Sequence, residues 1–369
     1  MGKITLAEAF LFDVPVAAER TDAVQAFLKQ ETVLVHLATD DGLEGRGYSY
    51  TIGTGGTAVL EMLRGYLLPK ALGADPACPE ALWEHLRRST LATMVGPITT
   101  LALAAVDTAA WDLRARAFGL PLWQLAGGAQ ESVPLYDTEG GWLHLGIAEL
   151  ADNAVAAVER GFGGVKVKIG KPQAADDVAR IAAVREAVGP HVALMVDANQ
   201  GLTRDDALRR ARLLEPYDLT WIEEPLPADD VEGHALLARS TTTPIAVGET
   251  LYSLGQFREY LARGAASVVQ PDVARIGGVT PWLKVAHLAE AFDVPVAPHF
   301  LMELHVSLAA AVTNGRWVEW IPQLESVTTS QITRTGGRAV PPGSAGLGVD
   351  WDDAALERCR AGGPPGAGA

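Results

Sequence analysis

Cysteine is scarce in this sequence of 369 residues, which contains only Cys78 and Cys359. Two cysteines so far apart provide neither a disulfide framework nor a cysteine-based zinc site. Long apolar runs are also missing, because no stretch approaches the roughly 18 uninterrupted apolar residues of a transmembrane helix. Glu8 and Asp13 interrupt the apolar N-terminal stretch, which is therefore not expected to be a signal peptide. We expect a soluble, cytoplasmic protein that has no membrane partner.

Basic residues are few as well: 30 lysines and arginines stand against 45 aspartates and glutamates, and the formal net charge is −15. A surface this acidic repels nucleic acid and anionic membranes. An anionic small molecule would therefore have to be held by a local cluster of cations or by a metal ion. Hydrophobic residues make up 48% of the chain, which suffices for a large core and is compatible with a homo-oligomer.

The order of apolar and polar segments predicts an α/β protein in three parts. Residues 1–128 are predicted to form an N-terminal α+β capping domain, with strands over 3–50 followed by helices as far as 117. Residues 129–324 alternate apolar runs with amphipathic stretches, as a TIM-like (β/α)8-type barrel requires. Residues 325–369 are predicted to return to the cap and to end in a flexible tail over 361–369.

Eight apolar runs are the predicted barrel strands, at residues 133–136, 164–169, 192–196, 219–222, 245–247, 266–269, 294–297 and 317–320. Polar side chains occur within seven of them or up to three residues after their ends: Lys166 and Lys168, Asp197, Glu223, Glu249, Asp272, His299 and Glu319. Successive members are 20 to 29 residues apart from Lys168 onward, about one strand–helix unit. We therefore expect them at the carboxyl ends of the strands, where barrel active sites are built.

Three of these residues are carboxylates that follow successive strands, namely Asp197, Glu223 and Glu249. Three anions held close together repel strongly unless a cation lies between them. Ligation by oxygen alone favours Mg²⁺ over zinc or copper. Any one of them could instead be a solvated strand-end acid or a helix cap, but three in register favour a metal site.

The two lysines are two residues apart on one strand, so Lys166 and Lys168 point to the same face. The apolar residues Val165, Val167 and Ile169 would occupy the other face, which argues against an edge strand facing water. Inside a barrel a lysine needs a partner. Two neighbouring ammonium groups beside a metal ion are expected to depress each other's pKa, which suits a neutral lysine acting as a general base.

A second proton carrier is predicted on the seventh strand. Asp272, one strand earlier than His299, could accept a hydrogen bond from one imidazole nitrogen and raise the basicity of the other. Without that partner His299 would more simply be a buried core histidine. Glu319 lies between apolar residues, and if buried it is expected to have a raised pKa and to donate a hydrogen bond to a developing oxyanion.

This ordered set of residues resembles the enolase superfamily, specifically its mandelate racemase subgroup (the mandelate racemase/muconate lactonizing enzyme family). The resemblance covers nearly the whole chain and includes Val106–Leu113, Gly119–Trp123, Lys166–Lys168, Val196–Asn199, Trp221–Pro225, Val247–Glu249, Gln270–Asp272, Gly277–Thr280 and His299. A Lys-x-Lys motif alone would be weak evidence, whereas the whole set at these spacings is specific.

The resemblance implies a role for each site residue. Asp197, Glu223 and Glu249 would bind one Mg²⁺, and Lys168, assisted by Lys166, would be one acid–base group. His299, oriented by Asp272, would be the other, and Glu319 would stabilise the enolate oxygen. Asn199 is a further polar contact, Thr138 stands where mandelate racemase has a serine, and Arg275 stands where it has a lysine. The substrate would be a small-molecule carboxylate that loses its α-proton.

Such a site could carry out either of two reactions. Return of a proton from the opposite face gives racemisation or epimerisation of a 2-hydroxy acid. Loss of a β-leaving group gives dehydration, or opening of a ring ether or lactone. A loop over 17–22 is expected to close over the barrel mouth, and its polar residues, Arg20 among them, suit a polyhydroxylated acid sugar. Acid-sugar dehydration or cycloisomerisation is therefore favoured.

Two other classes of function compete. The glycine-rich segment over 53–58 fits a dinucleotide-binding motif, but the required second strand is missing after the helix that follows. A lid loop, with Tyr50 and Thr51 near the substrate, explains this segment better. A non-catalytic barrel that only binds sugar acids is the second competitor, against which the complete set of metal ligands and bases argues.

Overall fold

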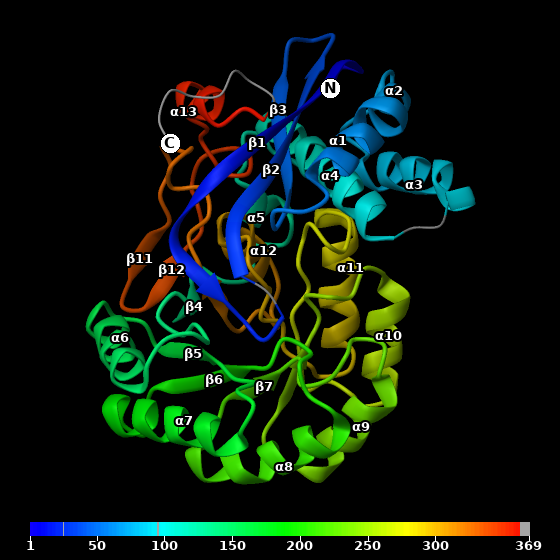
Figure 1. Ribbon diagram of the computed structural model, residues 1–369. Coiled ribbons are helices and arrows are strands. Elements are labelled where there is room, and N and C mark those ends of the chain that lie inside the picture. The colour runs from blue at the N-terminus through cyan, green and yellow to red at the C-terminus, as the bar shows by residue number, and fades with distance from the viewer. Residues whose placement is uncertain (25, 94–95, 362–369) are drawn as a thin grey trace.

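The structure of the protein is a computed structural model that describes residues 1–24, 26–93 and 96–361. Apart from Ala361, the tail predicted to be flexible lies outside the described residues. The described chain folds as a cap over one end of a barrel, and the hairpin of β1 and β2 extends from the cap toward the barrel (Figure 1). The predicted α/β architecture, a capping unit with a barrel, is confirmed.

The cap begins with three antiparallel strands, β1 (Ile4–Thr21), β2 (Ala26–Thr39) and β3 (Glu44–Thr51). They are followed by α1 (Gly56–Met62), η1 (Leu63–Leu67), α2 (Leu68–Ala71), α3 (Pro79–Ser89), η2 (Leu91–Thr93), α4 (Pro97–Phe118) and α5 (Leu122–Leu125). Residues 56–89, all of them described, form helices and turns but no strand, so the second strand of a dinucleotide-binding unit is not formed.

The segment over 17–22, expected to be a loop, is for the most part strand. Arg20 pairs with Phe27 and Thr21 with Ala26, so β1 and β2 form one long hairpin. A register shift between Pro15, which pairs with Lys29, and Arg20 interrupts the pairing.

Helix α4 connects the cap to the barrel. Most of its residues are buried, and it packs on β3 where Gly45 and Gly47 let the two backbones approach closely. The carboxylate of Asp107 accepts hydrogen bonds from the backbone N–H and the hydroxyl of Thr280, at 2.9 and 2.7 Å. The carboxylate of Asp112 accepts from the backbone N–H groups of Arg46 and Leu347. Buried carboxylates on α4 therefore satisfy backbone donors from three other segments.

The barrel consists of parallel strands with helices outside them (Figure 1). Its strands are β4 (Val133–Asp137), β5 (Gly164–Lys168), β6 (Ala193–Asp197), β7 (Trp221–Glu223), β8 (Ile245–Val247), β9 (Val268–Val269) and β10 (Val318–Trp320). Its helices are α6 (Ile147–Glu159), α7 (Ala174–Val188), α8 (Arg204–Leu214, extended by η3, Glu215–Tyr217), α9 (Val231–Ser240), α10 (Leu254–Ala262), α11 (Val279–Glu290) and α12 (Met302–Ala311).

Two details differ from a regular eightfold repeat. The seventh predicted strand is reduced to one bridge residue, Val296, which pairs with Val269 and Gly315, since the preceding Pro295 cannot donate to a ladder. Between β10 and α13 (Asp353–Arg358) the described chain contains no helix. The hairpin of β11 (Thr333–Thr335) and β12 (Arg338–Val340) pairs there with β4 instead.

The C-terminal segment contacts the cap. The backbone N–H of Asp13 donates to the carbonyl of Cys359 at 2.7 Å, and that of Ala361 donates to the carbonyl of Leu11 at 2.9 Å. The exact boundaries of the three parts stay a prediction.

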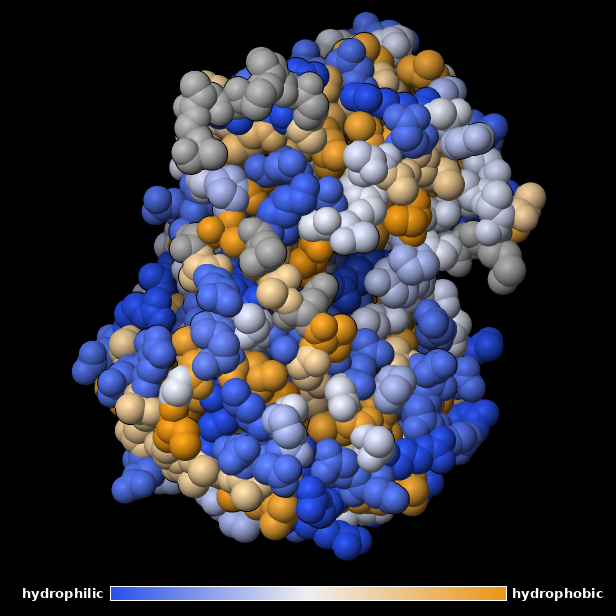
Figure 2. Space-filling model, in the orientation of Figure 1, coloured by the Kyte–Doolittle hydropathy of each residue, from blue (hydrophilic) through white to orange (hydrophobic). Residues whose placement is uncertain are grey.

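Hydrophilic and hydrophobic residues are interspersed over the face shown in Figure 2. Among the described helices, none combines the length and the apolar character that a membrane span needs.

The close approach of β3 to α4 makes Gly47 a stability determinant. A methyl group on Gly47 would collide with the backbone of Ala105 and Ala109. We expect Gly47→Ala to lower the free energy of unfolding by about 1–3 kcal/mol, because a packed interior cannot absorb the extra volume without strain. Chemical denaturation measures this change.

Gly65→Ala is the matched control, because Gly65 lies in η1 and the added methyl group meets no atom within 4 Å apart from its own helix backbone and chain neighbours. This second variant should be neutral or stabilised by up to about 1 kcal/mol. Equal stability of the two variants would contradict the packing inferred for β3 and α4.

Candidate active site

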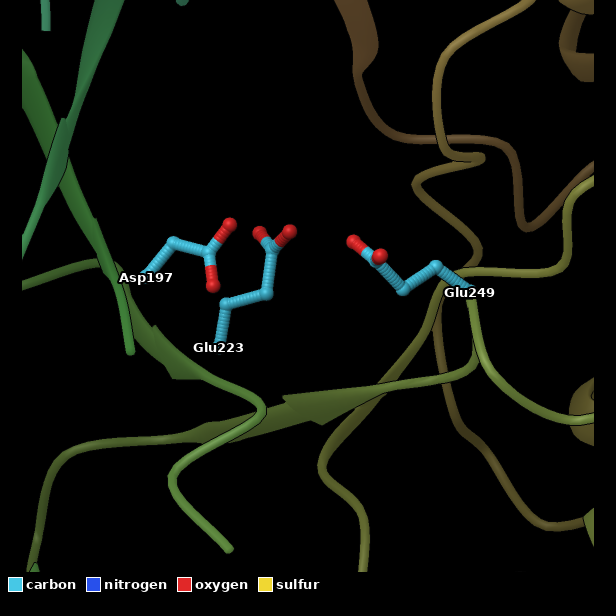
Figure 3. Close-up of side chains that lie close together, drawn as sticks. All are labelled: Asp197, Glu223 and Glu249. Carbon is cyan, nitrogen blue, oxygen red and sulfur yellow. The ribbon is translucent and has the colours of Figure 1, made fainter. Parts of the chain in front are cut away.

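Three carboxylates converge at the carboxyl ends of β6, β7 and β8. Asp197 and Glu223 end their strands, and Glu249 follows β8 by two residues. Each offers an oxygen within 4.8 Å of the others, and all three side chains are buried. In Figure 3 the carboxylate of Glu249 points toward those of Asp197 and Glu223 from the opposite side. The predicted convergence is confirmed.

The donor set fits a hard divalent cation. All the candidate ligand atoms are carboxylate oxygens, and Oε2 of Glu249 is buried and accepts no hydrogen bond. Burial and the neighbouring charge of Asp197 raise the pKa of Glu223 above its usual value. A bound cation would remove this repulsion, which is the reason the sequence predicted Mg²⁺ here.

Lys166 and Lys168 lie on β5 and point into the barrel beside the carboxylates. The Nζ atom of Lys166 lies 2.7 Å from Glu223 and 2.8 Å from Glu319, and that of Lys168 lies 2.5 Å from Asp197. Both side chains are buried, and β5 lies between β4 and β6, so the alternative of an edge strand facing water does not hold.

Lys166 lowers the pKa of Lys168 as the spacing predicted, but in the chain alone the net pKa of both lysines is raised, and a depressed pKa beside a bound metal ion stays a prediction. Burial lowers the pKa of Lys166, but the carboxylates of Glu223 and Glu319 outweigh it and raise that pKa well above its ordinary value. Burial and Lys166 lower the pKa of Lys168, yet Asp197 reverses the balance and the net pKa is raised. The spacing on one strand correctly placed the two positive charges side by side. It could not show how close the carboxylates of Asp197, Glu223 and Glu319 would lie to them.

His299 and Asp272 form the predicted pair. Nδ1 of His299 lies 2.9 Å from Oδ2 of Asp272, and Nε2 lies 3.3 Å from Oε2 of Glu249. Burial alone would raise the pKa of Asp272, but the hydrogen bond and charge of His299 lower it to about 2. The pKa of His299 is raised, because Glu249 and Asp272 outweigh its burial.

Tyr50, predicted as a substrate contact, lies in β3 of the cap. Its hydroxyl donates to Oδ2 of Asp272 at 2.6 Å, and Nε of Arg275 donates to that hydroxyl at 3.2 Å. Arg275 also donates from Nη1 to Oε1 of Glu249, at 3.2 Å. The sequence marked Arg275 only as a departure from mandelate racemase. No residue pattern showed that it would connect the third carboxylate to the cap.

Glu319, on β10, is buried as expected, but the prediction of a raised pKa is wrong. Although burial favours the neutral acid, the ammonium group of Lys166 lowers the pKa of Glu319 below its usual range. Its carboxylate accepts from the hydroxyl of Thr138 at 2.7 Å and from the backbone N–H of Phe300 at 2.9 Å. Thr138, a predicted substrate contact, thus donates to Glu319 within the protein.

The other two predicted substrate contacts have different surroundings. Asn199 has a positive φ of 42°, and its Oδ1 is buried without a hydrogen-bond partner. Arg20 is buried, with Nη2 2.5 Å from Glu139 and 2.9 Å from the carbonyl of Pro322. Its guanidinium is therefore engaged by the chain itself. Reasoning from sequence missed Gln270, whose amide donates to Glu223 at 2.7 Å and which lies only two residues before Asp272.

Comparison with protein families places both halves of the chain. Residues 7–127 match the model "Mandelate racemase / muconate lactonizing enzyme, N-terminal domain", and residues 149–355 match "Enolase C-terminal domain-like". Together these two models account for most of the sequence.

Two characterised relatives are 36% identical to this chain. L-talarate/galactarate dehydratase of Salmonella typhimurium aligns over 95% of this chain and 89% of its own length. 3,6-Anhydro-alpha-L-galactonate cycloisomerase of Streptomyces coelicolor aligns over 95% and 98%.

Among solved structures, L-talarate dehydratase from Polaromonas sp. JS666, complexed with Mg and L-glucarate, superposes with a TM-score of 0.93 and 39% identity over 98% of each chain. The carboxylate triad, the matches to both family models and these relatives agree. The chain belongs to the mandelate racemase/muconate lactonizing enzyme family of the enolase superfamily.

Proposed function

We propose that this enzyme removes the proton α to the carboxylate of an acid sugar, in a Mg²⁺-dependent dehydration or cycloisomerisation. The observation that carries the proposal is the position of two proton carriers at opposite ends of one carboxylate triad. Lys168 contacts Asp197, and His299 contacts Glu249. Relatives that act on acid sugars as dehydratases and as a cycloisomerase support the substrate class.

The metal site would be formed by Asp197, Glu223 and Glu249. Bound there, Mg²⁺ supplies Lewis-acid stabilisation of the negative charge that develops on the substrate carboxylate. Lys166 adds a buried positive charge at the same place, held by Glu223 and Glu319. We propose that Glu319 also holds Lys166, whose Nζ atom lies 2.8 Å away, in addition to stabilising the enolate oxygen as expected from the sequence.

The two proton carriers divide the work. Lys168 takes the α-proton on one face of the substrate, and His299, oriented through Nδ1 by Asp272, donates a proton from Nε2 to the departing β-oxygen. If His299 instead returns the proton to the α-carbon, the product is an epimer.

Accumulation of a 2-keto acid from a panel of acid sugars identifies dehydration, and inversion without loss of water identifies a racemase or epimerase. A barrel that only binds sugar acids would give neither product.

Four residues remain proposed to bind the substrate: Asn199, Thr138, Tyr50 and Arg20. The unpartnered buried oxygen of Asn199 makes it the best placed of the four to contact a substrate directly. Tyr50, Thr138 and Arg20 are engaged by Asp272, Glu319 and Glu139, so we propose that they act by holding those residues. A homo-oligomer in the cytoplasm, without a nucleic-acid partner, remains our expectation.

Replacing the proton carriers tests the two-sided scheme. We expect Lys168→Ala and His299→Asn each to lower kcat by roughly 100- to 10,000-fold, because each removes a general acid or base. Mass spectrometry of reactions in deuterated water follows both turnover and exchange of the α-proton. Circular dichroism controls for folding. Undiminished turnover in the double variant would show that these residues do not carry the protons.

Metal removal tests the triad. Dialysis against a chelator should abolish turnover and lower Tm, and added Mg²⁺ should restore both, because a ligand that binds only the folded state stabilises it. Glu249→Gln should weaken the Mg²⁺ dependence of Tm. Asp230→Asn is the control, since Asp230 caps α9 and pairs with Arg204 and is not one of the three clustered carboxylates. A Tm that does not respond to Mg²⁺ in the wild-type protein would contradict the assignment of the triad.

A further inference from the structure

The end of β5 that carries Lys168 has a sheet partner on one side only. The register with β6 runs from Gly164 to Lys168, whereas the register with β4 covers only Gly164 and Val165. Beyond Val165 the neighbour on the β4 side is the loop over 138–146, which contains turns but no strand or helix. The backbone N–H of Lys168 donates to the carbonyl of Gly141 in that loop, at 2.8 Å.

One side chain, on the helix that follows the strand, forms hydrogen bonds to both the loop and the strand. Arg180, on α7, donates to the carbonyls of Leu145 at 2.5 Å, Trp142 at 3.1 Å and Lys168 at 3.4 Å. Its side chain is buried, with 3% of its surface exposed. The backbone of Lys168 is therefore held on both sides: its N–H bonds the loop, and its carbonyl accepts from Arg180.

The loop also covers the ammonium group of Lys168. The ring centroid of Trp142 lies 5.6 Å from its Nζ atom, within the range of a cation–π contact. Arg180 fixes the backbone carbonyl of that tryptophan. A displacement of the loop would therefore move both the backbone and the surroundings of Lys168 together.

A second cluster supports the residues that follow Lys168. The carboxylate of Asp177 accepts from the backbone N–H groups of Gly170 at 2.9 Å and Lys171 at 3.3 Å, and it forms an ion pair with Arg210. Arg210 in turn donates to the carbonyl of Lys171 at 2.7 Å. Side chains of α7 and α8 thus hold the residues that follow this strand, and Arg180 is the side chain of α7 that also reaches the loop.

We propose that Arg180 is a positioning residue for the proton carrier Lys168, acting by cross-linking the 138–146 loop to the end of β5. The inference rests on the proposed function, because it takes Lys168 as an acid–base group. It predicts that loss of Arg180 affects proton transfer on the Lys168 face and spares the His299 face. A misplacement of about 1 Å can lower the rate of a positioned reaction roughly 100-fold.

Arg185, on the same helix, provides a matched control. It donates to the four carbonyls of Tyr217, Gly189, Val192 and Asp218, at 2.7 to 3.1 Å. These carbonyls precede β6 and β7, at the ends of the strands away from the triad. Arg180→Met and Arg185→Met therefore both remove an arginine bound to backbone carbonyls, but only the first should disturb Lys168.

The experiment measures kcat, KM and solvent-deuterium exchange with a pair of acid sugars that differ only in configuration at the α-carbon. Lys168→Ala and His299→Asn identify which epimer presents its proton to which residue. We expect Arg180→Met to lower kcat and Lys168-face exchange about 10- to 100-fold, with KM within about threefold and His299-face exchange retained. Arg185→Met should keep both exchange rates. Equal losses on the two faces, or an equal loss in Arg185→Met, would overturn the proposal.

Amide hydrogen exchange at Lys168 gives a readout that does not depend on turnover. Protection of this N–H should fall in Arg180→Met and persist in Arg185→Met, whereas unchanged protection in both would overturn the proposal. If Arg180→Met does not fold, Arg180→Lys, which keeps the charge but cannot span three carbonyls, replaces it in both measurements. Absence of exchange with any acid in the wild-type enzyme would instead contradict the proposed function.

Discussion

The balance of buried charge at the strand ends is the constraint on which the rest of the site depends. Carboxylates from β6, β7 and β10 and the two lysines of β5 share a volume from which water is largely excluded, so each charge must be matched by another. In the chain alone the lysines supply that match, and their pKa values rise accordingly. A divalent cation among the carboxylates would take over part of this role. The site is thus organised around positive charge at the place where we propose that a substrate anion gains more negative charge.

The cap takes part in this arrangement as well as covering it. Tyr50 of β3 binds Asp272, and Arg20 of the β1–β2 hairpin binds Glu139 in the loop beside Lys168. His299 is therefore connected to the cap through Asp272, and the loop that contacts the backbone of Lys168 is connected to the cap through Glu139. A cap that shifted as a unit would change the surroundings of both, which connects the packing of α4 on β3 to the chemistry at the barrel mouth.

Much of the site could be predicted from the sequence because barrel geometry converts spacing into position. Residues one strand–helix unit apart must lie on neighbouring strand ends, and this placed Asp197, Glu223 and Glu249 together and His299 beside Asp272. What the sequence could not predict depends on distances between side chains. The pKa of Glu319 is lowered because Lys166 lies 2.8 Å away, and the guanidinium of Arg20 forms an ion pair with Glu139. The reduced seventh strand likewise reflects one local residue, Pro295, within a run that is otherwise strand-like.

The most direct test of the central claim is to locate the metal. A crystal of the enzyme soaked with Mn²⁺, which prefers the same carboxylate ligands as Mg²⁺, gives an anomalous signal that reports the position of the ion. The account predicts one strong peak, bounded by oxygens of Asp197, Glu223 and Glu249. A strong peak elsewhere, or none between these carboxylates, would contradict it.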